Sequence, residues 1–84
     1  MSARRCFVPT RAYILINTEA GQAEAVVRAL RQLPGVASAD LVTGGYDVVA
    51  SVAGDDVNAI GRLVLNPIHG IAGLKTTNTL IVVV

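Results

Sequence analysis

The residues that could bind a small molecule gather in two polar segments, Thr43-Gly44-Gly45-Tyr46-Asp47 and Lys75-Thr76-Thr77-Asn78-Thr79. Glycines leave backbone N–H and C=O groups open to a ligand. Asp47 can hold an ammonium group, and threonine hydroxyls donate or accept hydrogen bonds. Such a set could bind both ends of an amino acid. The other interpretation is structural: a hairpin turn in which Asp47 hydrogen-bonds its own loop, with the threonines as ordinary strand residues.

Residues for catalysis or metal binding are few. Asp55 and Asp56 are adjacent, but the dipole at a helix N-terminus explains them better than acid–base chemistry does. Cys6 is the one cysteine and His69 the one histidine, so the sequence offers no internal disulfide and no metal cluster. No phosphate-binding glycine motif is present. We therefore expect no catalytic residue, no metal, no cofactor and no enzymatic activity; an enclosed pocket containing His69 would favour a small ferredoxin-like enzyme instead.

The composition indicates a protein that associates with other copies of itself. Hydrophobic residues make up 52% of the 84 residues and charged residues 15%, against about 25% charged in a typical soluble domain. A core this small is marginal without disulfides, metals or association. The net charge of +1 argues against nucleic acid as the main partner. No membrane span or secretory signal is visible, so the expected location is the cytoplasm.

Hydrophobic periodicity predicts six elements after a loose lead-in over residues 1–10, with a single domain over 11–84. Strands are expected over 12–18, 36–43, 46–53 and 76–84, with helices over 20–33 and 56–66. The order β-α-β-β-α-β with right-handed crossovers predicts an α+β, ferredoxin-like fold. Its four-stranded antiparallel sheet would carry both helices on one face.

Glycine and proline set the expected connections. Pro34-Gly35 should end the first helix, and Gly44-Gly45 suits a tight hairpin because glycine adopts positive φ without steric cost. Pro67 should end or kink the second helix near Asn66, since the residue before a proline avoids helical angles.

Side-chain alternation leaves the sheet apolar on both faces. In the first strand Tyr13 and Leu15 point one way, and Ile14 and Ile16 point the other way. The third and fourth strands are also apolar on both sides, whereas an antiparallel sheet with a solvated face would show polar residues there. Two helices cover only one face, so we expect a second copy to cover the other in a two-fold dimer.

The chain resembles the ligand-binding and oligomerisation domain of the leucine-responsive regulator/asparagine-regulator (Lrp/AsnC) family, over about residues 11–84. The resemblance rests on four segments: AYILINTEAGQAEAV, LPGVASADLVTGGYDVVASV, IGRLVL and GLKTTNTLIVV. The most specific piece is the Gly-x-Tyr-Asp element formed by Gly44, Tyr46 and Asp47.

The resemblance implies a ferredoxin-like fold, dimers packed sheet to sheet, and assembly of dimers into rings, as octamers or decamers. It also implies an amino-acid effector bound between dimers. One subunit would supply Gly44, Gly45, Tyr46 and Asp47, and a neighbour would supply the threonines Thr76, Thr77 and Thr79.

Two features depart from the family pattern. Family regulators carry an N-terminal helix-turn-helix, which the ten residues before the domain cannot contain. The resemblance therefore implies a stand-alone effector domain without sequence-specific DNA binding, which modulates transcription indirectly and co-assembles with full-length regulators. Pro67 also interrupts a helix that usually runs longer. A ligand-free structural partner of such regulators is the alternative function.

Overall fold

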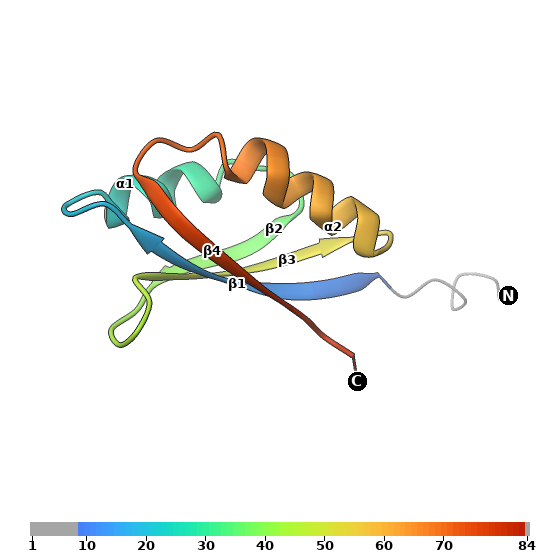
Figure 1. Cartoon of the computed structure of the whole chain (residues 1–84). Coiled ribbons are helices and arrows are strands. Elements are labelled where there is room, and N and C mark those ends of the chain that lie inside the picture. The colour runs from blue at the N-terminus through green and yellow to red at the C-terminus, as the bar shows by residue number, and fades with distance from the viewer. Residues whose placement is uncertain (1–8, 84) are drawn as a thin grey trace, which may run out of the picture.

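The structure, a computed structural model, describes residues 9–83. Its elements follow the predicted order (Figure 1). They are β1 (Thr10–Thr18), α1 (Ala23–Leu30), β2 (Val36–Leu41), β3 (Val48–Gly54), α2 (Val57–Leu63), the π-helical η2 (Val64–Ile68) and β4 (Leu74–Ile81). Most of the predicted lead-in and the last residue, Val84, lie outside the described residues, and β1 already begins at Thr10.

The four strands form one antiparallel sheet in the order β2-β3-β1-β4, and α1 and α2 lie on the same side of it (Figure 1). β1 is therefore a central strand that pairs with β3 on one side and with β4 on the other. This arrangement confirms the predicted ferredoxin-like α+β fold.

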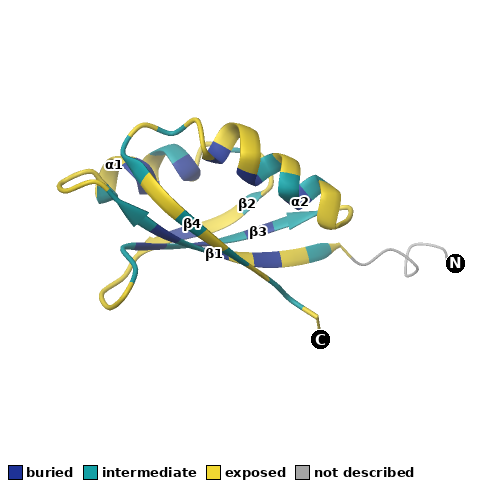
Figure 2. Ribbon diagram, viewed as in Figure 1, coloured by how far each residue is buried: buried dark blue, intermediate teal, exposed yellow. Residues whose placement is uncertain are grey.

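The core lies between the helices and one face of the sheet (Figure 2). Ile14 and Ile16 of β1 are completely buried, as are Val48 and Val52 of β3. From the other layer, the fully buried side chains of Val26, Leu30, Ile60 and Ile68 pack against them. The alternation of buried and exposed residues along β1 and β3 confirms the side-chain directions predicted for these strands.

Helix α1 is shorter than its apolar pattern predicted. It ends at Leu30, and the chain continues in tight turns, with the Gln32 N–H donating to Ala29 O (3.1 Å) and the Leu33 N–H to Leu30 O (3.0 Å). Gly35 then adopts a φ of 93°, which reverses the chain into β2 at a conformation that other residues rarely adopt. The predicted stop at Pro34-Gly35 therefore operates through this turn.

Pro67 was predicted to end or kink the helix near Asn66; the helix does not end there, so that half of the prediction was wrong, but the α-helical part stops at Leu63. The helix continues from α2 into η2, which contains Pro67 and reaches Ile68. A proline inside an α-helix removes one hydrogen bond and crowds the carbonyl of the preceding turn. Here the helix widens into a π-turn, in which the His69 N–H donates to Val64 O (3.1 Å), and the wider turn accommodates the ring.

The connection between β2 and β3 is also longer than predicted. The expected tight Gly44-Gly45 turn is instead a loop from Val42 to Asp47, closed by a hydrogen bond from the Val42 N–H to Asp47 O (2.9 Å). Only Gly44 has a positive φ, of 132°. A two-residue hairpin of the usual type requires specific backbone angles at both central residues, and these glycines do not adopt them.

The face of the sheet without helices carries a half-exposed apolar patch. Tyr13 of β1 lies directly opposite Leu80 of β4, and their side chains are 42% and 47% exposed. Leu15 and Val49, neighbours on the same face, are partly buried. From Lys75 to Thr79, β4 is polar on both faces, so the apolar patch does not extend along the whole strand as the sequence interpretation implied.

No helix among residues 9–83 is long and apolar enough to cross a membrane.

Candidate functional site

The two predicted polar segments emerge at the same end of the sheet, on either side of the end of β1. The loop from Val42 to Asp47 lies beside β1 because the Asp47 N–H donates to Ile16 O (2.9 Å). On the other side of β1, Thr76 of β4 pairs with Asn17. A single strand end therefore connects the two segments.

Asp47 is held by β1. One carboxylate oxygen, Oδ2, accepts a hydrogen bond from the Thr18 N–H at 2.9 Å and another from the Thr18 hydroxyl at 3.3 Å. The structural interpretation had Asp47 bonded within its own loop, but its partner lies 29 residues away in the sequence. The described hydrogen bonds of this carboxylate all end on Oδ2, which leaves Oδ1 open to another cationic or N–H group.

Tyr46 extends across the sheet. Its hydroxyl accepts a hydrogen bond from Asn78 Nδ2 at 3.3 Å. Asn78 pairs with Leu15 and shares its face, which is the face without helices. Since β1 lies between β3 and β4, the Tyr46 side chain crosses β1 on that face to reach Asn78.

The two glycines of the loop are exposed and unobstructed. A Cβ atom added at Gly44 or Gly45 would meet no other atom within 4 Å. The backbone of this loop is therefore open to a ligand, which is what the sequence interpretation requires of it.

The three threonines of β4 divide between the two faces of the sheet. Thr76 lies on the face without helices, where its hydroxyl accepts a hydrogen bond from Asn17 Nδ2 (3.2 Å). Thr77 and Thr79 pair with Ile16 and Ile14, so they lie on the helix side. Within one subunit, the structure does not bring all seven predicted site residues to one surface.

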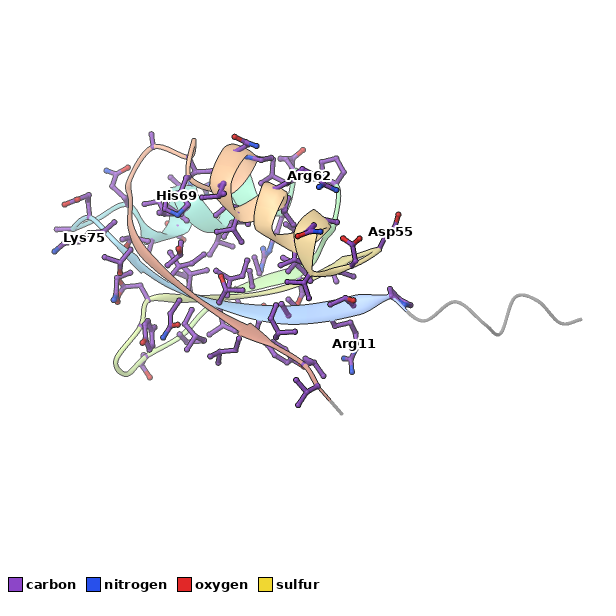
Figure 3. The ribbon with its side chains drawn as sticks, turned by 45° about the vertical axis from the view of Figure 1, so that its right-hand side comes forward. Arg11, Asp55, Arg62, His69 and Lys75 are labelled. Atoms are coloured by element: carbon purple, nitrogen blue, oxygen red, sulfur yellow. The ribbon has the colours of Figure 1, made fainter. Side chains whose placement is uncertain are left out.

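His69 joins the helix-side part of this end. Its Nε2 atom lies 3.2 Å from the hydroxyl of Thr77. Figure 3 shows His69 and Lys75 at one end of the molecule, with Arg11 and Asp55 at the opposite end. Lys75 sits at a β-bulge, where the register between β1 and β4 shifts, and bulges redirect side chains beside binding sites.

The sequence interpretation did not assign Asn17, Thr18 or His69 to the site. The first two become neighbours of the predicted residues only through the pairing of β1 with β3 and β4. Within residues 9–83, no three His, Cys, Asp or Glu side chains lie close enough to hold a metal ion.

Comparisons with known proteins identify the relatives of this chain. A family model described as the Lrp/AsnC ligand binding domain matches residues 11–83. An uncharacterized HTH-type transcriptional regulator of Pyrococcus horikoshii is 31% identical over 68 residues, which cover 81% of this chain and 43% of the relative. The chain thus spans less than half the length of the curated relatives it matches.

Solved structures share the fold. A crystal structure of a protein from Thermus thermophilus superposes with a TM-score of 0.85 at 33% sequence identity, covering 89% of this chain and 94% of that one. The structure of AsnC from E. coli superposes with a TM-score of 0.87 at 25% identity, covering all of this chain (100%) and 57% of AsnC.

Proposed function

We propose that this chain, which belongs to the Lrp/AsnC ligand binding domain family, senses an amino acid, self-associates and modulates transcriptional regulation indirectly. One observation carries the proposal: the glycine loop and the polar start of β4 emerge together at the end of β1. That end of the sheet combines open backbone N–H groups, hydroxyls and a carboxylate. An amino acid, with its own carboxylate and ammonium group, is complementary to such a set.

The effector binds between subunits. Thr77 and Thr79 lie on the opposite side of the sheet from Thr76, so one ligand cannot contact all the proposed residues within a single chain. A neighbouring subunit supplies the threonines, while Gly44, Gly45, Tyr46 and Asp47 come from the first subunit. The free Oδ1 atom of Asp47 holds the ammonium group of the effector.

Methionine is the first amino acid to test. A transcriptional regulator of Neisseria meningitidis with this fold, 22% identical and with a TM-score of 0.82, has been solved as a complex with L-Met. The two chains share the fold. The thermal-shift panel described below decides which amino acid binds to this chain.

Self-association occurs through the face of the sheet without helices. This face carries Tyr13, Leu15, Val49 and Leu80. The side chains of Tyr13 and Leu80 are half-exposed, and apolar surface of this kind favours burial against a partner. A second copy packed sheet to sheet buries them in a homodimer, and dimers assemble further into octameric or decameric rings in the cytoplasm. Regulation of transcription then proceeds through co-assembly with full-length, DNA-binding regulators.

A thermal-shift panel of the twenty amino acids tests the sensing function. A ligand that binds the folded state raises the melting temperature, so at least one amino acid at millimolar concentration should do so. Asp47→Asn is the diagnostic variant, because an amide oxygen still accepts the Thr18 hydrogen bonds while the negative charge is lost. It should abolish the shift and leave the fold intact. A flat panel with the unaltered chain contradicts amino-acid sensing.

The bond between Asp47 and Thr18 favours one other function, a ligand-free assembly partner of full-length regulators, because it gives Asp47 a structural role. In that case the particle mass measured by light scattering is the same with and without each amino acid, but it changes when a full-length regulator is added.

A further inference from the structure

The sheet has two edges, which differ in whether their outward-pointing backbone groups have hydrogen-bond partners. β2 forms one edge and β4 the other. An edge strand presents unpaired N–H and C=O groups that can pair with another strand, and natural proteins usually block such edges with charges, bulges or covering segments.

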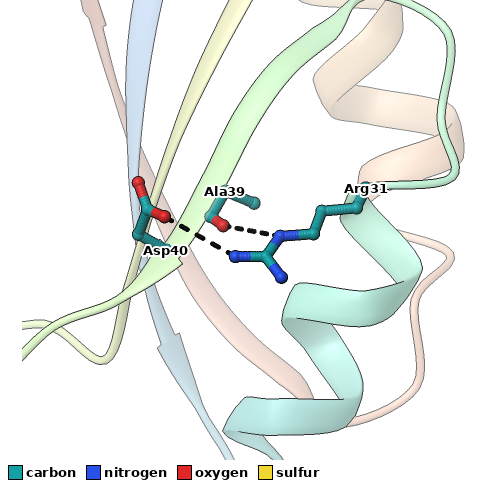
Figure 4. A network of polar contacts seen from close by, with 3 residues as sticks. All are labelled: Arg31, Ala39 and Asp40. Atoms are coloured by element: carbon teal, nitrogen blue, oxygen red, sulfur yellow. Dashed lines mark hydrogen bonds and ion pairs between the residues drawn. The ribbon is translucent and has the colours of Figure 1, made fainter.

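The edge at β2 is blocked in part. The Val42 N–H donates across the ladder to Asp47 O, and bonded and non-bonded pairs alternate in an antiparallel ladder, so the backbone groups of Ala39 point away from β3. Arg31, which follows the end of α1, covers the carbonyl group: its Nε–H donates to Ala39 O at 2.9 Å, and its guanidinium lies 3.6 Å from the Asp40 carboxylate (Figure 4). A register shift between Val36 and Ser38 interrupts the same edge.

The edge at β4 carries a bulge and a charge only at its start, at Lys75, and is open from Thr76 onward. The Val82 N–H donates to Arg11 O at 2.9 Å, and by the same alternation the backbone groups of Thr77, Thr79 and Ile81 point away from β1. None of these groups has a hydrogen-bond partner among residues 9–83. No element lies beyond β4 in Figure 1.

We infer that a second copy of this chain adds to the β4 edge, so that two sheets join strand to strand. The inference rests on the self-association that the proposed function includes, and it specifies an interface other than the sheet face. A two-fold axis at Asn78, the middle of the stretch from Lys75 to Ile81, sets Thr77 of each copy opposite Thr79 of the other. Such pairs exchange two backbone hydrogen bonds, and threonine pairs are favourable neighbours across strands.

The charges on this edge are compatible with two-fold pairing. Lys75 is the only charged residue in β4. In the proposed register the two Lys75 side chains lie at opposite ends of the joined strands, each beside Ile81 of the other copy. The joined sheet keeps all helices on one side, so the faces without helices remain available for sheet-to-sheet packing. Two different two-fold interfaces then connect more than two copies into a larger assembly.

A charge exchange at the paired threonines tests both the interface and its register. The double variant T77E/T79E places glutamate opposite glutamate in both pairs, whereas T77K/T79E places lysine opposite glutamate. Both variants lose the contact between His69 and Thr77 and both alter Thr79, so they differ only in the charge at position 77. Circular dichroism verifies that each is folded.

Light scattering at matched concentrations should give four or more copies for the unaltered chain and for T77K/T79E, and two copies for T77E/T79E. A third variant, Thr79→Pro, removes only an outward-pointing N–H and should also give two copies; it decides the question if a double variant fails to fold. Equal masses for the two double variants, or a particle of two copies or fewer for the unaltered chain, would overturn the edge interface. Thermal shifts of the unaltered chain with the twenty amino acids test the sensing function separately. If no amino acid raises the melting temperature, the difference in particle mass between the two double variants is still expected.

Discussion

The carboxylate of Asp47 accepts hydrogen bonds from both the backbone N–H and the hydroxyl of Thr18, at 2.9 and 3.3 Å. This pair fastens the loop between β2 and β3 to the end of the central strand β1. The residue proposed to hold the ammonium group of an effector therefore also fixes the position of the exposed glycines. Binding and loop geometry depend on one side chain.

Asp47→Ala should destabilise the fold, whereas Asp47→Asn should change it little. Alanine leaves the partly buried Thr18 N–H without its acceptor, which costs about 1–3 kcal/mol, while asparagine retains an acceptor oxygen. Urea unfolding at one fixed protein concentration measures the free energy of unfolding for each variant. If alanine and asparagine give the same stability, the hydrogen bonds to Thr18 contribute nothing to holding the loop.

Gly73→Ala should be among the more damaging glycine substitutions. Gly73 has a φ of 92°, and an added Cβ would lie 2.7 Å from Gln22 Cβ. Backbone strain of this kind costs about 1–3 kcal/mol, and Gln22 must also move. Gly45→Ala is the matched control, because its φ is not positive and nothing lies within 4 Å of the added Cβ; it should stay within about 0.5 kcal/mol. Thermal unfolding of the two variants side by side would expose any error in this ranking.

The sequence predicted the fold well because the apolar periods are clear. Alternation in β1 and β3 and the spacing of Val26 and Leu30 define which faces meet, and the structure buries those side chains. The expected end of the helix near Asn66 was wrong because a helix can accommodate a proline in two ways, by ending or by widening, and the sequence shows no preference between them. The buried Ile68, which anchors η2 in the core, favours widening.

The candidate site was harder to predict from sequence. The composition of the two polar segments was visible, but the partner of Asp47 was not, because Thr18 reaches it only through strand pairing. Alternation already implied that Thr76 and Thr77 point to opposite faces. Grouping them in one ligand shell therefore requires a second subunit, and that requirement follows from the backbone.

Arg31→Met should promote association of the edge at β2 with little effect on stability. The Arg31 and Asp40 side chains are 55% and 68% exposed, and exposed ion pairs contribute about 0–1 kcal/mol. The larger effect is the loss of the cover on Ala39 O, which leaves the edge free to pair. Light scattering over a concentration series should show larger particles for Arg31→Met than for Arg28→Met, which removes a charge from the exposed side of α1. Identical profiles would mean that Arg31 does not protect this edge.

Lysine substitutions on the sheet face test the proposed sheet-to-sheet dimer. Tyr13 and Leu80 lie opposite each other on β1 and β4, so Tyr13→Lys together with Leu80→Lys places two charges in the middle of the proposed interface. Burying unpaired charges is strongly unfavourable, and the particle mass should fall to half or less. Because both side chains are already half-exposed in the single chain, the fold itself should survive.

The matched control places the same charges on the helix layer. Val57 and Leu65 are 57% and 72% exposed, more than Tyr13 and Leu80, and they lie on α2 and η2 rather than on the sheet. Val57→Lys with Leu65→Lys should keep the original mass, because no proposed interface includes them. If this control lost mass and the sheet-face variant did not, the dimer interface would lie on the helix layer and not on the sheet. The apolar residues of the sheet face would then have no role in the dimer.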